Sequence, residues 1–356
     1  MSLPISIYNL WAKKKPYPRS KMSEVYKDSV IIDGCSPLCA TFNEYKRYLN
    51  GGVTAACCTV LKPGSYDLQE CIKGFIDYYN KIDKDSATKL ILSVDDLYQA
   101  KKEGKFGIIL SFQGGAYLRG DIRMLEAYYH LGLRQLMLCY NEKNALGDGC
   151  TEPGDGGLTL FGEKCINEMT RLGIVTDISH TGYRTTMEAM EIMQALGKPC
   201  IVSHGNAKAV YDTPRNLTDE QALRCAEVGG IVGVNGYPGF ISVKKKPSVD
   251  DFLDHIDHYV KLLGIDHVSL GMDYYQFQQG IFPNIVNKKV YDYLIEAGTW
   301  TKEAYPEPPY YYPQGIQVPD LLPNLVPAMQ KRGYSDSNIR QVLGENYIRV
   351  LKEIWN

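Results

Sequence analysis

Eight short hydrophobic segments recur along the chain, separated for the most part by amphipathic stretches. Nearly every position in each segment is apolar, which is typical of strands covered on both faces of a parallel sheet. The segments are SVIIDG (29–34), VTAACCTV (53–60), GIILSFQG (107–114), QLMLCY (135–140), IVTDIS (174–179), CIVSHG (200–205), GIVGVNG (230–236) and HVSLGMD (267–273).

Helical patterns lie between most of these segments. Residues 162–173, GEKCINEMTRLG, carry apolar side chains at helical spacing, and Gly173 is expected to end the helix. Residues 218–230 begin with Thr218 as an N-cap, and Gln221 three positions later completes a capping box. Buried strands that alternate with helices predict an α/β fold, a (β/α)8 TIM barrel. The other possibility is an open, doubly wound sheet, but DGCSPLC after the first strand is not a glycine-rich phosphate loop.

The length of the chain suits one barrel. It has 356 residues, of which 44% are hydrophobic, so we expect a single domain over residues 1–356. Residues 274–322 are rich in proline and aromatic side chains. We expect this segment to form an excursion over the top of the barrel, or, through residues 304–313, a contact between the subunits of a homodimer.

Charge and cysteine content narrow the possible partners. The net charge is −2, with 39 Lys and Arg against 41 Asp and Glu, which does not indicate nucleic-acid binding. No apolar run is long enough to span a bilayer.

The first apolar piece precedes the basic cluster KKKPYPRSK, the reverse of the order in a secretory signal. Ten cysteines, several of them inside apolar strands, are expected to be reduced and buried. These features predict a cytoplasmic protein with no membrane partner.

Polar side chains follow several of the predicted strands, at the end where a barrel of this kind carries its active site. His180 and His204 end the fifth and sixth strands, and Asp273 ends the eighth. Imidazoles that hold a metal ion and a carboxylate that takes a proton from water suit metal-assisted hydrolysis. Arg215, in DTPRN, could bind a substrate carboxylate through paired hydrogen bonds. The other candidates at strand ends are Asp33, Cys35, Gln113, Tyr140, Asn141, Asn235 and Tyr237.

These residues also have structural interpretations. A histidine at a strand end is more often a packing residue than a ligand, Asp273 can cap the segment after it, and Arg215 can form a surface ion pair. Asp177 precedes His180 by three residues in the same strand and is expected to orient its ring. Structural or solvated roles are expected for the remaining histidines, His130, His255, His258 and His267.

Five longer stretches resemble the membrane (renal) dipeptidase family, peptidase family M19, whose members are amidohydrolase-type barrels. The resemblance covers most of the chain, from SVIIDG to the C-terminus. The stretches are GLTLFGEKCINEMTRLGIVTDISH, VSHGNAKAVYDTPRNLTDE, GGIVGVNGYPGFIS, DHIDHYVKLLGIDHVSLGMD and LLPNLVPAMQKRGYSDSNIRQVLGENYIRVLKEIW.

The resemblance implies a role for four residues. In that family a His-x-Asp after the first strand holds one zinc ion, a Glu bridges it to a second, and two His hold the second ion. His180 and His204 match these two His. Asp273 matches an Asp that assists the chemistry, and Arg215 matches an Arg that binds the carboxylate of the dipeptide.

The chain departs from the family pattern at the first zinc site. In DGCSP, Cys35 stands in place of the His and Pro37 in place of the Asp. Gln113 stands in place of the bridging Glu, and Tyr140 in place of a substrate-contacting His. The family's acidic run after Asp273 is YYQ here.

These departures predict a reduced metal centre. We expect at most one zinc ion per chain, on His180 and His204, with Gln113 or a Cys35 thiolate as further candidate ligands. Two alternatives stay open, because the site could hold no metal and Cys35 could be a buried thiol that fills the vacated space.

Three functions are consistent with this sequence. In the first, the chain is a dipeptidase-like hydrolase of a small amide or dipeptide whose carboxylate Arg215 binds. Tyr140, Asn141 and Tyr237 would be further substrate contacts. In the second, a metal-free acid/base enzyme, an isomerase or lyase, acts on a small carboxylate. In the third, a degenerate site serves as a non-catalytic ligand-binding pocket. A nucleophilic role for Cys35 with a histidine base has no further support in the sequence.

Overall fold

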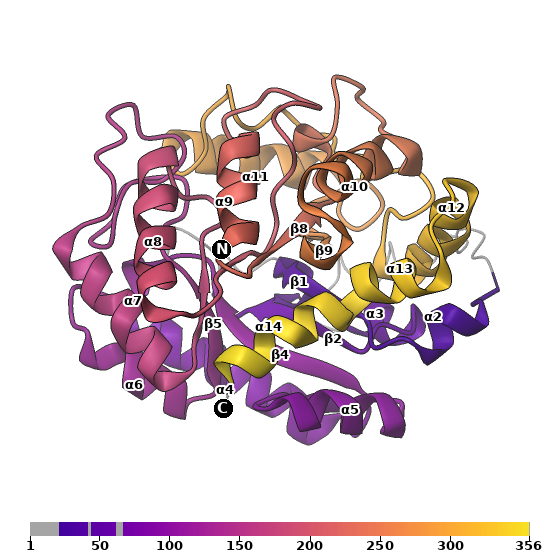
Figure 1. The fold of residues 1–356 in the computed structure, drawn as a ribbon, viewed down its shortest axis with the longest axis horizontal. Coiled ribbons are helices and arrows are strands. Elements are labelled where there is room, and N and C mark those ends of the chain that lie inside the picture. Colours follow the sequence, from indigo (N-terminus) through magenta and orange to yellow (C-terminus); the bar gives the residue numbers. More distant parts are fainter. Residues whose placement is uncertain (1–20, 42–43, 62–66, 356) are drawn as a thin grey trace.

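The strands of the chain form one parallel sheet that curves into a barrel (Figure 1). The computed structural model describes residues 21–41, 44–61 and 67–355. Neighbouring strands follow the order β1-β2-β4-β5-β6-β7-β8-β9, and β3 pairs with the first residues of β4. The strands are β1 (Ile32–Ser36), β2 (Ala55–Thr59), β3 (Thr88–Leu90), β4 (Phe106–Phe112), β5 (Leu133–Met137), β6 (Val175–Asp177), β7 (Ile201–Val202), β8 (Ile231–Asn235) and β9 (Val268–Gly271).

Each of the eight predicted strands is present, which confirms the (β/α)8 barrel. The additional strand β3 is not predicted by the hydrophobic pattern, because its three residues are a mixed TKL sequence and only Thr88 is fully buried. Hydrogen bonds between the end of β9 and the end of β1 close the barrel. Met272 N–H donates to Asp33 Oδ1 at 2.7 Å, and Asp273 N–H donates to the Cys35 carbonyl at 3.0 Å.

Helices cover the outside of the barrel, and α6 to α9 follow one another on one side of it (Figure 1). The two predicted helix ends are confirmed. Gly173 ends α7 with φ +80°, and Thr218 and Gln221 form the capping box of α9. The helices are α2 (Glu24–Asp28), α3 (Lys46–Asn50), α4 (Leu68–Lys84), α5 (Val94–Glu103), α6 (Arg123–His130), α7 (Leu160–Leu172), α8 (Tyr183–Leu196), α9 (Asp219–Glu227), α10 (Val249–Leu263), α11 (Asn284–Glu296), α12 (Leu325–Lys331), α13 (Asp336–Arg340) and α14 (Asn346–Ile354).

The last helix, α14, packs against side chains from inside the barrel. Its residues Tyr347 and Leu351 belong to the same buried cluster as Cys57 and other residues of the strands. The Tyr347 hydroxyl donates to Oε1 of Gln135 at 2.5 Å and lies 3.3 Å from the Cys57 sulfur. The C-terminal helix therefore supplies part of the inner core.

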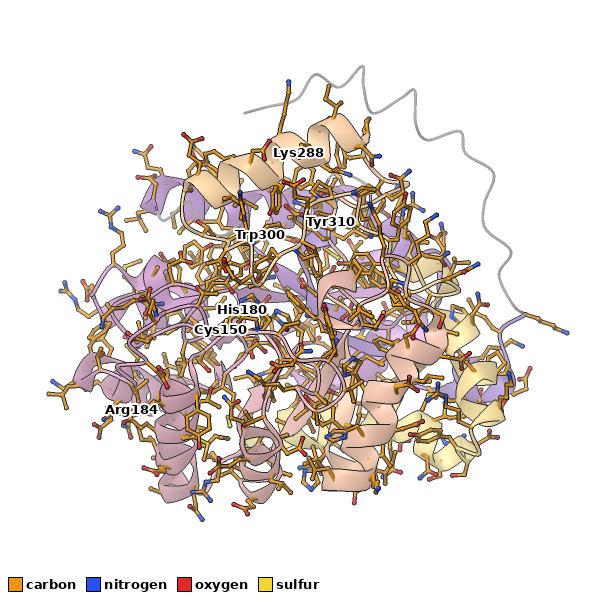
Figure 2. The ribbon with its side chains drawn as sticks, turned by 90° about the horizontal axis from the view of Figure 1, so that it is seen from above. Cys150, His180, Arg184, Lys288, Trp300 and Tyr310 are labelled. Atoms are coloured by element: carbon orange, nitrogen blue, oxygen red, sulfur yellow. The ribbon has the colours of Figure 1, made fainter. Side chains whose placement is uncertain are left out.

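The aromatic segment after β9 lies over the strand ends. Figure 2 shows Trp300 and Tyr310 between His180 and the helix that carries Lys288, α11. Tyr305, Tyr310 and Tyr312 are at most 2% exposed. Their rings are used within the chain, so the expected dimer contact through residues 304–313 could not use these three side chains.

All ten cysteines are free thiols, and nine of them are buried. No helix in the described part of the chain combines the length and the apolar character that crossing a bilayer requires.

Candidate metal and substrate site

The structure brings the predicted site residues together at the carboxyl end of the barrel. They come from β1, from the loops that follow β4 to β9, and from the stretch between β7 and α9 that carries Arg215. Asp273 is partly exposed, and the others are buried. The set is Cys35, Gln113, Tyr140, Asn141, His180, His204, Arg215, Tyr237 and Asp273.

His180 and His204 point their Nε2 atoms toward each other, at a distance of 2.8 Å. The other ring nitrogen of His180, Nδ1, lies 2.8 Å from Asn141 Oδ1. The Asn141 amide nitrogen donates to the carbonyl of Thr299, so its oxygen faces the ring. His180 therefore carries its proton on Nδ1 and keeps a lone pair on Nε2, the arrangement of a histidine prepared for a ligand.

A chain of hydroxyl groups supports His204. Ser203 Oγ lies 2.7 Å from His204 Nδ1 and 3.0 Å from Ser179 Oγ, which donates to Asp177 at 2.8 Å. A hydroxyl can donate or accept, so Ser203 can accept a proton from Nδ1 and leave Nε2 free for a ligand. The expectation that Asp177 orients His180 therefore does not describe this geometry, because its carboxylate acts through two serines on His204.

Two of the site residues have left-handed backbone conformations. The φ angles are +65° at His180 and +50° at Asp273. Non-glycine residues rarely adopt this region, and such strain concentrates at functional sites. These conformations turn the chain sharply just after β6 and β9, where both side chains join the site.

Cys35, His204 and Asp273 form a group of three candidate ligands. One donor atom from each lies within 4.8 Å of the other two, and Cys35 Sγ is 3.8 Å from Asp273 Oδ1. Gln113 adjoins this group but presents its amide nitrogen, which donates to Cys35 Sγ at 3.1 Å and to Thr59 Oγ1 at 2.9 Å. An amide nitrogen is a donor and holds no metal ion.

Burial and the nearby arginine control the protonation of the site. Burial, and then the positive charge of Arg215, lower the pKa values of His180 and His204 well below the usual value, so both rings are neutral at pH 7. Removal from water raises the pKa of Asp273 to about 7, although Arg215 opposes this shift. Burial and the neighbouring Asp273 raise the pKa of the Cys35 thiol.

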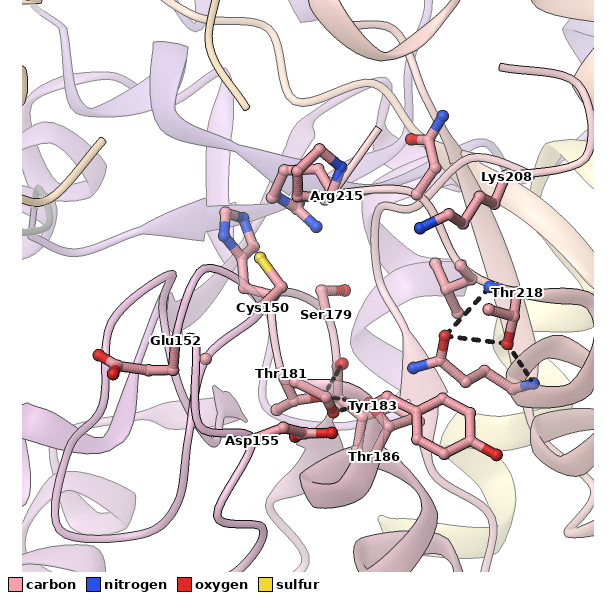
Figure 3. Close-up of a pocket in the computed structure, with 18 residues that line it drawn as sticks. Cys150, Glu152, Asp155, Ser179, Thr181, Tyr183, Thr186, Lys208, Arg215 and Thr218 are labelled. Atoms are coloured by element: carbon pink, nitrogen blue, oxygen red, sulfur yellow. Dashed lines mark hydrogen bonds between the residues drawn. The ribbon is translucent and has the colours of Figure 1, made fainter. Parts of the chain in front are cut away.

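The buried guanidinium of Arg215 borders a cavity of about 330 Å³ (Figure 3). Its Nε and Nη2 atoms have no hydrogen-bond partner within the described ranges. The guanidinium lies over the ring of Phe240, with Cζ 5.1 Å from the ring centroid. Cys150, Ser179 and His180 line the same cavity. Two unpaired nitrogens on a buried guanidinium are costly, so Arg215 is suited to bind an anionic group in the cavity.

Aromatic side chains form a wall beside the histidines. Tyr140 stacks on His180 with ring centroids 4.3 Å apart, and Trp300 Nε1 donates to the Tyr140 hydroxyl at 3.1 Å. Tyr305 stacks on Trp300 at 4.2 Å. Tyr237 is buried against Trp300 and Tyr305. Tyr140 thus holds the His180 ring by stacking on its face, and Asn141 holds it by a hydrogen bond at its edge.

Three of the remaining histidines have structural contacts, as expected. His255 is buried, accepts a hydrogen bond from Ala207 N–H at Nδ1 and faces the Ile241 carbonyl with Nε2. His258 lies 2.7 Å from Asp219, and His267 lies 2.7 Å from the Gly230 carbonyl.

The donors present fit one divalent ion. Two neutral imidazoles, a carboxylate and a thiol are all ligand types that zinc accepts. Pro37 offers no side-chain donor, and Gln113 presents a nitrogen, so among the positions that the family uses for a first ion and its bridge only Cys35 can supply a ligand here.

Several contributors to the site were not predicted. Ser179 and Ser203 each stand directly before a candidate histidine, so the repeated Ser-His pair in DISH and VSH was the available signal. Three more residues reach the site from long connections whose sequence shows no regular spacing of hydrophobic positions: Cys150, Trp300 and Tyr305.

A barrel with such donors at the carboxyl ends of its strands is the architecture of amidohydrolase-type enzymes. An amidohydrolase from Pseudomonas aeruginosa superposes with a TM-score of 0.83 and is 30% identical, with 93% of this chain and 98% of that chain covered. The family model of membrane dipeptidases, peptidase family M19, matches residues 19–303. The chain belongs to this family.

Curated relatives agree with this assignment. An uncharacterized dipeptidase of Schizosaccharomyces pombe is 35% identical over 276 residues, 74% of this chain and 57% of that protein. A dipeptidase of Claviceps purpurea is 27% identical over 263 residues, 73% of this chain and 54% of that protein. This chain thus spans about half the length of the curated relatives it matches.

A more distant solved structure shows the same fold. It is a metallo peptidase from Rhodobacter sphaeroides bound to a phosphinate mimic of the dipeptide L-Ala-D-Ala. The TM-score is 0.73 at 21% identity, with 92% of this chain and 100% of that chain covered.

Proposed function

We propose that this protein hydrolyses a small amide or dipeptide-like substrate that bears a free carboxylate, with a single zinc ion as its metal centre. The observation that carries the proposal is the buried Arg215, which has two unpaired nitrogens and borders the cavity that His180 lines. Membership of the M19 family and the dipeptidase names of its relatives support the reaction class.

Arg215 would bind the substrate carboxylate through its Nε and Nη2 atoms. Both groups are charged, and Arg215 is buried, so these hydrogen bonds would be strong and directional. The fixed carboxylate would place the amide of the substrate near His180, which lines the same cavity. The phosphinate dipeptide mimic in the Rhodobacter sphaeroides protein supports a ligand of this chemical class.

A zinc ion at the histidines would supply a Lewis acid for the amide carbonyl and would lower the pKa of a bound water. Asp273 would take the proton from the attacking water with a carboxylate oxygen that does not bind the ion. Tyr140 and Asn141 would hold the His180 ring in place from its face and its edge. The walls of Tyr237, Trp300 and Tyr305 would keep water out.

The test compares dipeptides with the matching dipeptide amides, which lack the free carboxylate, in assays of amine release with zinc present. Dipeptides should be cleaved and their amides should be cleaved far more slowly. In Arg215→Lys, kcat/KM for dipeptides should fall by about tenfold or more, because a lysine cannot donate in the same paired geometry.

Arg134→Lys is the matched control. Arg134 is also buried over an aromatic ring, Tyr129, but carbonyl oxygens already accept from its Nε and Nη1. This variant should keep the kcat/KM of the parent protein. Equal cleavage of dipeptides and their amides, or no cleavage of either, would contradict the proposal. In the second case, the metal-free acid/base enzyme and the non-catalytic pocket would become the leading hypotheses.

Free, buried thiols support a reducing compartment, and we place the protein in the cytoplasm. A homodimer also remains a prediction, which sedimentation or light scattering of the purified protein would test.

A further inference from the structure

We infer that Cys35 is a thiolate ligand of a single divalent metal ion, which it holds together with His204 and Asp273. The proposal adds a ligand set to the function above, but it is tested without substrate. It predicts an ion of the zinc type, because a thiolate, an imidazole and a carboxylate together suit zinc and exclude magnesium and calcium as preferred ions.

Geometry is the first support. The three donor atoms lie within 4.8 Å of one another, and the Cys35 sulfur is 3.8 Å from Asp273 Oδ1. Zinc bonds of about 2.3 Å to sulfur and 2.0 Å to nitrogen or oxygen place ligands roughly 3.5 Å apart, so the donor atoms would have to approach by no more than about 1.3 Å. His204 Nδ1 is held by Ser203, which leaves Nε2 as the nitrogen that faces the group. Nε2 of His180 lies 2.8 Å from Nε2 of His204, so His180 is a further candidate ligand for the same ion.

The neighbours of Cys35 are the second support. Gln113 donates an N–H to the sulfur at 3.1 Å, a contact that stabilises a thiolate. A carboxylate at position 113 could not donate and would add a third negative charge beside Cys35 and Asp273. The Gln113 amide can therefore donate to a Cys35 thiolate without adding negative charge, which suits a site for one ion.

Charge balance is the third support. One thiolate and one carboxylate together offset the charge of one dication, and the Cys35 thiol is buried. A second ion would need further anionic donors. Within the described ranges, the only group of three or more potential metal ligands is the one formed by Cys35, His204 and Asp273.

The experiment loads the purified, metal-stripped full chain with Co²⁺ and records its absorption spectrum, with metal content measured by elemental analysis. We expect about one ion per chain and an intense near-ultraviolet band from thiolate-to-cobalt charge transfer. The wild-type spectrum is the first test of the proposal. One bound cobalt without this band, no bound metal, or two ions per chain would each overturn it.

Variants then identify the sulfur. Cys35→Ser should lose the band, and Cys35→His should bind cobalt without it, because an imidazole replaces the thiolate as a ligand. Cys150→Ser is the control, since Cys150 is the thiol that lines the neighbouring cavity, and it should keep the band. A band that persists in folded Cys35→His or disappears in folded Cys150→Ser would overturn the assignment.

The spectroscopic test of the metal site and the activity test of the proposed hydrolase can fail independently. A thiolate band in a protein that cleaves no dipeptide would leave the metal site standing and reject the hydrolase. Cleavage of dipeptides by a protein without the band would support the hydrolase and reject the Cys35 metal site.

Discussion

The side-chain oxygen of Asn141 lies 2.8 Å from Nδ1 of His180 and determines which nitrogen of that ring carries the proton. Asn141 is itself held in this orientation by the carbonyl of Thr299 and the hydroxyl of Tyr305. Both belong to the aromatic segment that follows the last strand. A long connection outside the barrel therefore sets the chemistry of a residue at the end of β6.

Ser203→Ala should weaken zinc binding. The change removes the hydroxyl that accepts from His204 Nδ1 when Nε2 binds a metal ion. Loss of such an orienting contact typically costs 10- to 100-fold in metal affinity, and a fall of about this size is expected in competition with a coloured chelator. Ser269→Ala is the control, because its hydroxyl is also buried but has no partner in the described part of the chain. Equal affinities in the two variants would refute the role of Ser203.

Gly271→Ala should destabilise the barrel strongly. A Cβ at this position would lie 1.8 Å from the carbonyl oxygen of Ser203, which is backbone and cannot move freely. Relief of this overlap should cost about 3 kcal/mol in the free energy of unfolding, measured by urea denaturation. Gly154→Ala meets no atom within 4 Å and has no left-handed φ, so its stability should match that of the parent protein. A Gly271→Ala protein of unchanged stability would show that β7 and β9 are not so closely packed.

Tyr347→Phe should lower the free energy of unfolding by about 1 to 2 kcal/mol, because Gln135 Oε1 loses the hydroxyl that donates to it inside the barrel. In Tyr259→Phe, the control, the lost hydroxyl is buried without a partner among the residues described, and stability should stay equal or rise. Thermal and urea unfolding of both variants would measure this difference. A larger loss in Tyr259→Phe than in Tyr347→Phe would contradict the inner-core role of α14.

His255 should make the protein less stable as the pH falls. Burial lowers its pKa to about 4 in the folded chain, whereas an unfolded histidine titrates near 6.5. Between these values the unfolded chain binds the proton and the folded chain does not, so the free energy of unfolding falls with decreasing pH. The contribution of this residue is about 3 kcal/mol between pH 7 and 4.

The same residue supplies the control for this pH effect. His255→Gln can still accept from Ala207 N–H, so the variant is expected to fold. Its stability, measured by denaturation from pH 7.5 to 5, should fall less steeply than that of the parent protein. Parallel curves would mean that His255 is not the titrating group.

The sequence predicts the barrel well because its strands are buried on both faces and therefore read as continuous apolar runs. Glycine and capping signals also locate helix ends such as Gly173 and Thr218. Strand ends identify the candidate site, since parallel strands bring their carboxyl ends to one side.

Other features depend on spatial relations that no local pattern encodes. The pairing of Asp177 with His204 through two serines arises from the register of β6 against β7. The direction of the Gln113 amide depends on Cys35 and Thr59, which are distant in the chain. A short strand such as β3 has too few residues to show a period.

Cys35 and Asp273 are separated by 238 positions, and the hydrogen bonds between the ends of β9 and β1 bring them together. During synthesis, the ribosome releases Cys35 early and Asp273 only after most of the barrel has been made. A nascent chain therefore has no complete set of donors to offer an ion until its last strand meets its first. Metal acquisition would then be a late event in maturation, and a chain cut short before β9 would stay unloaded.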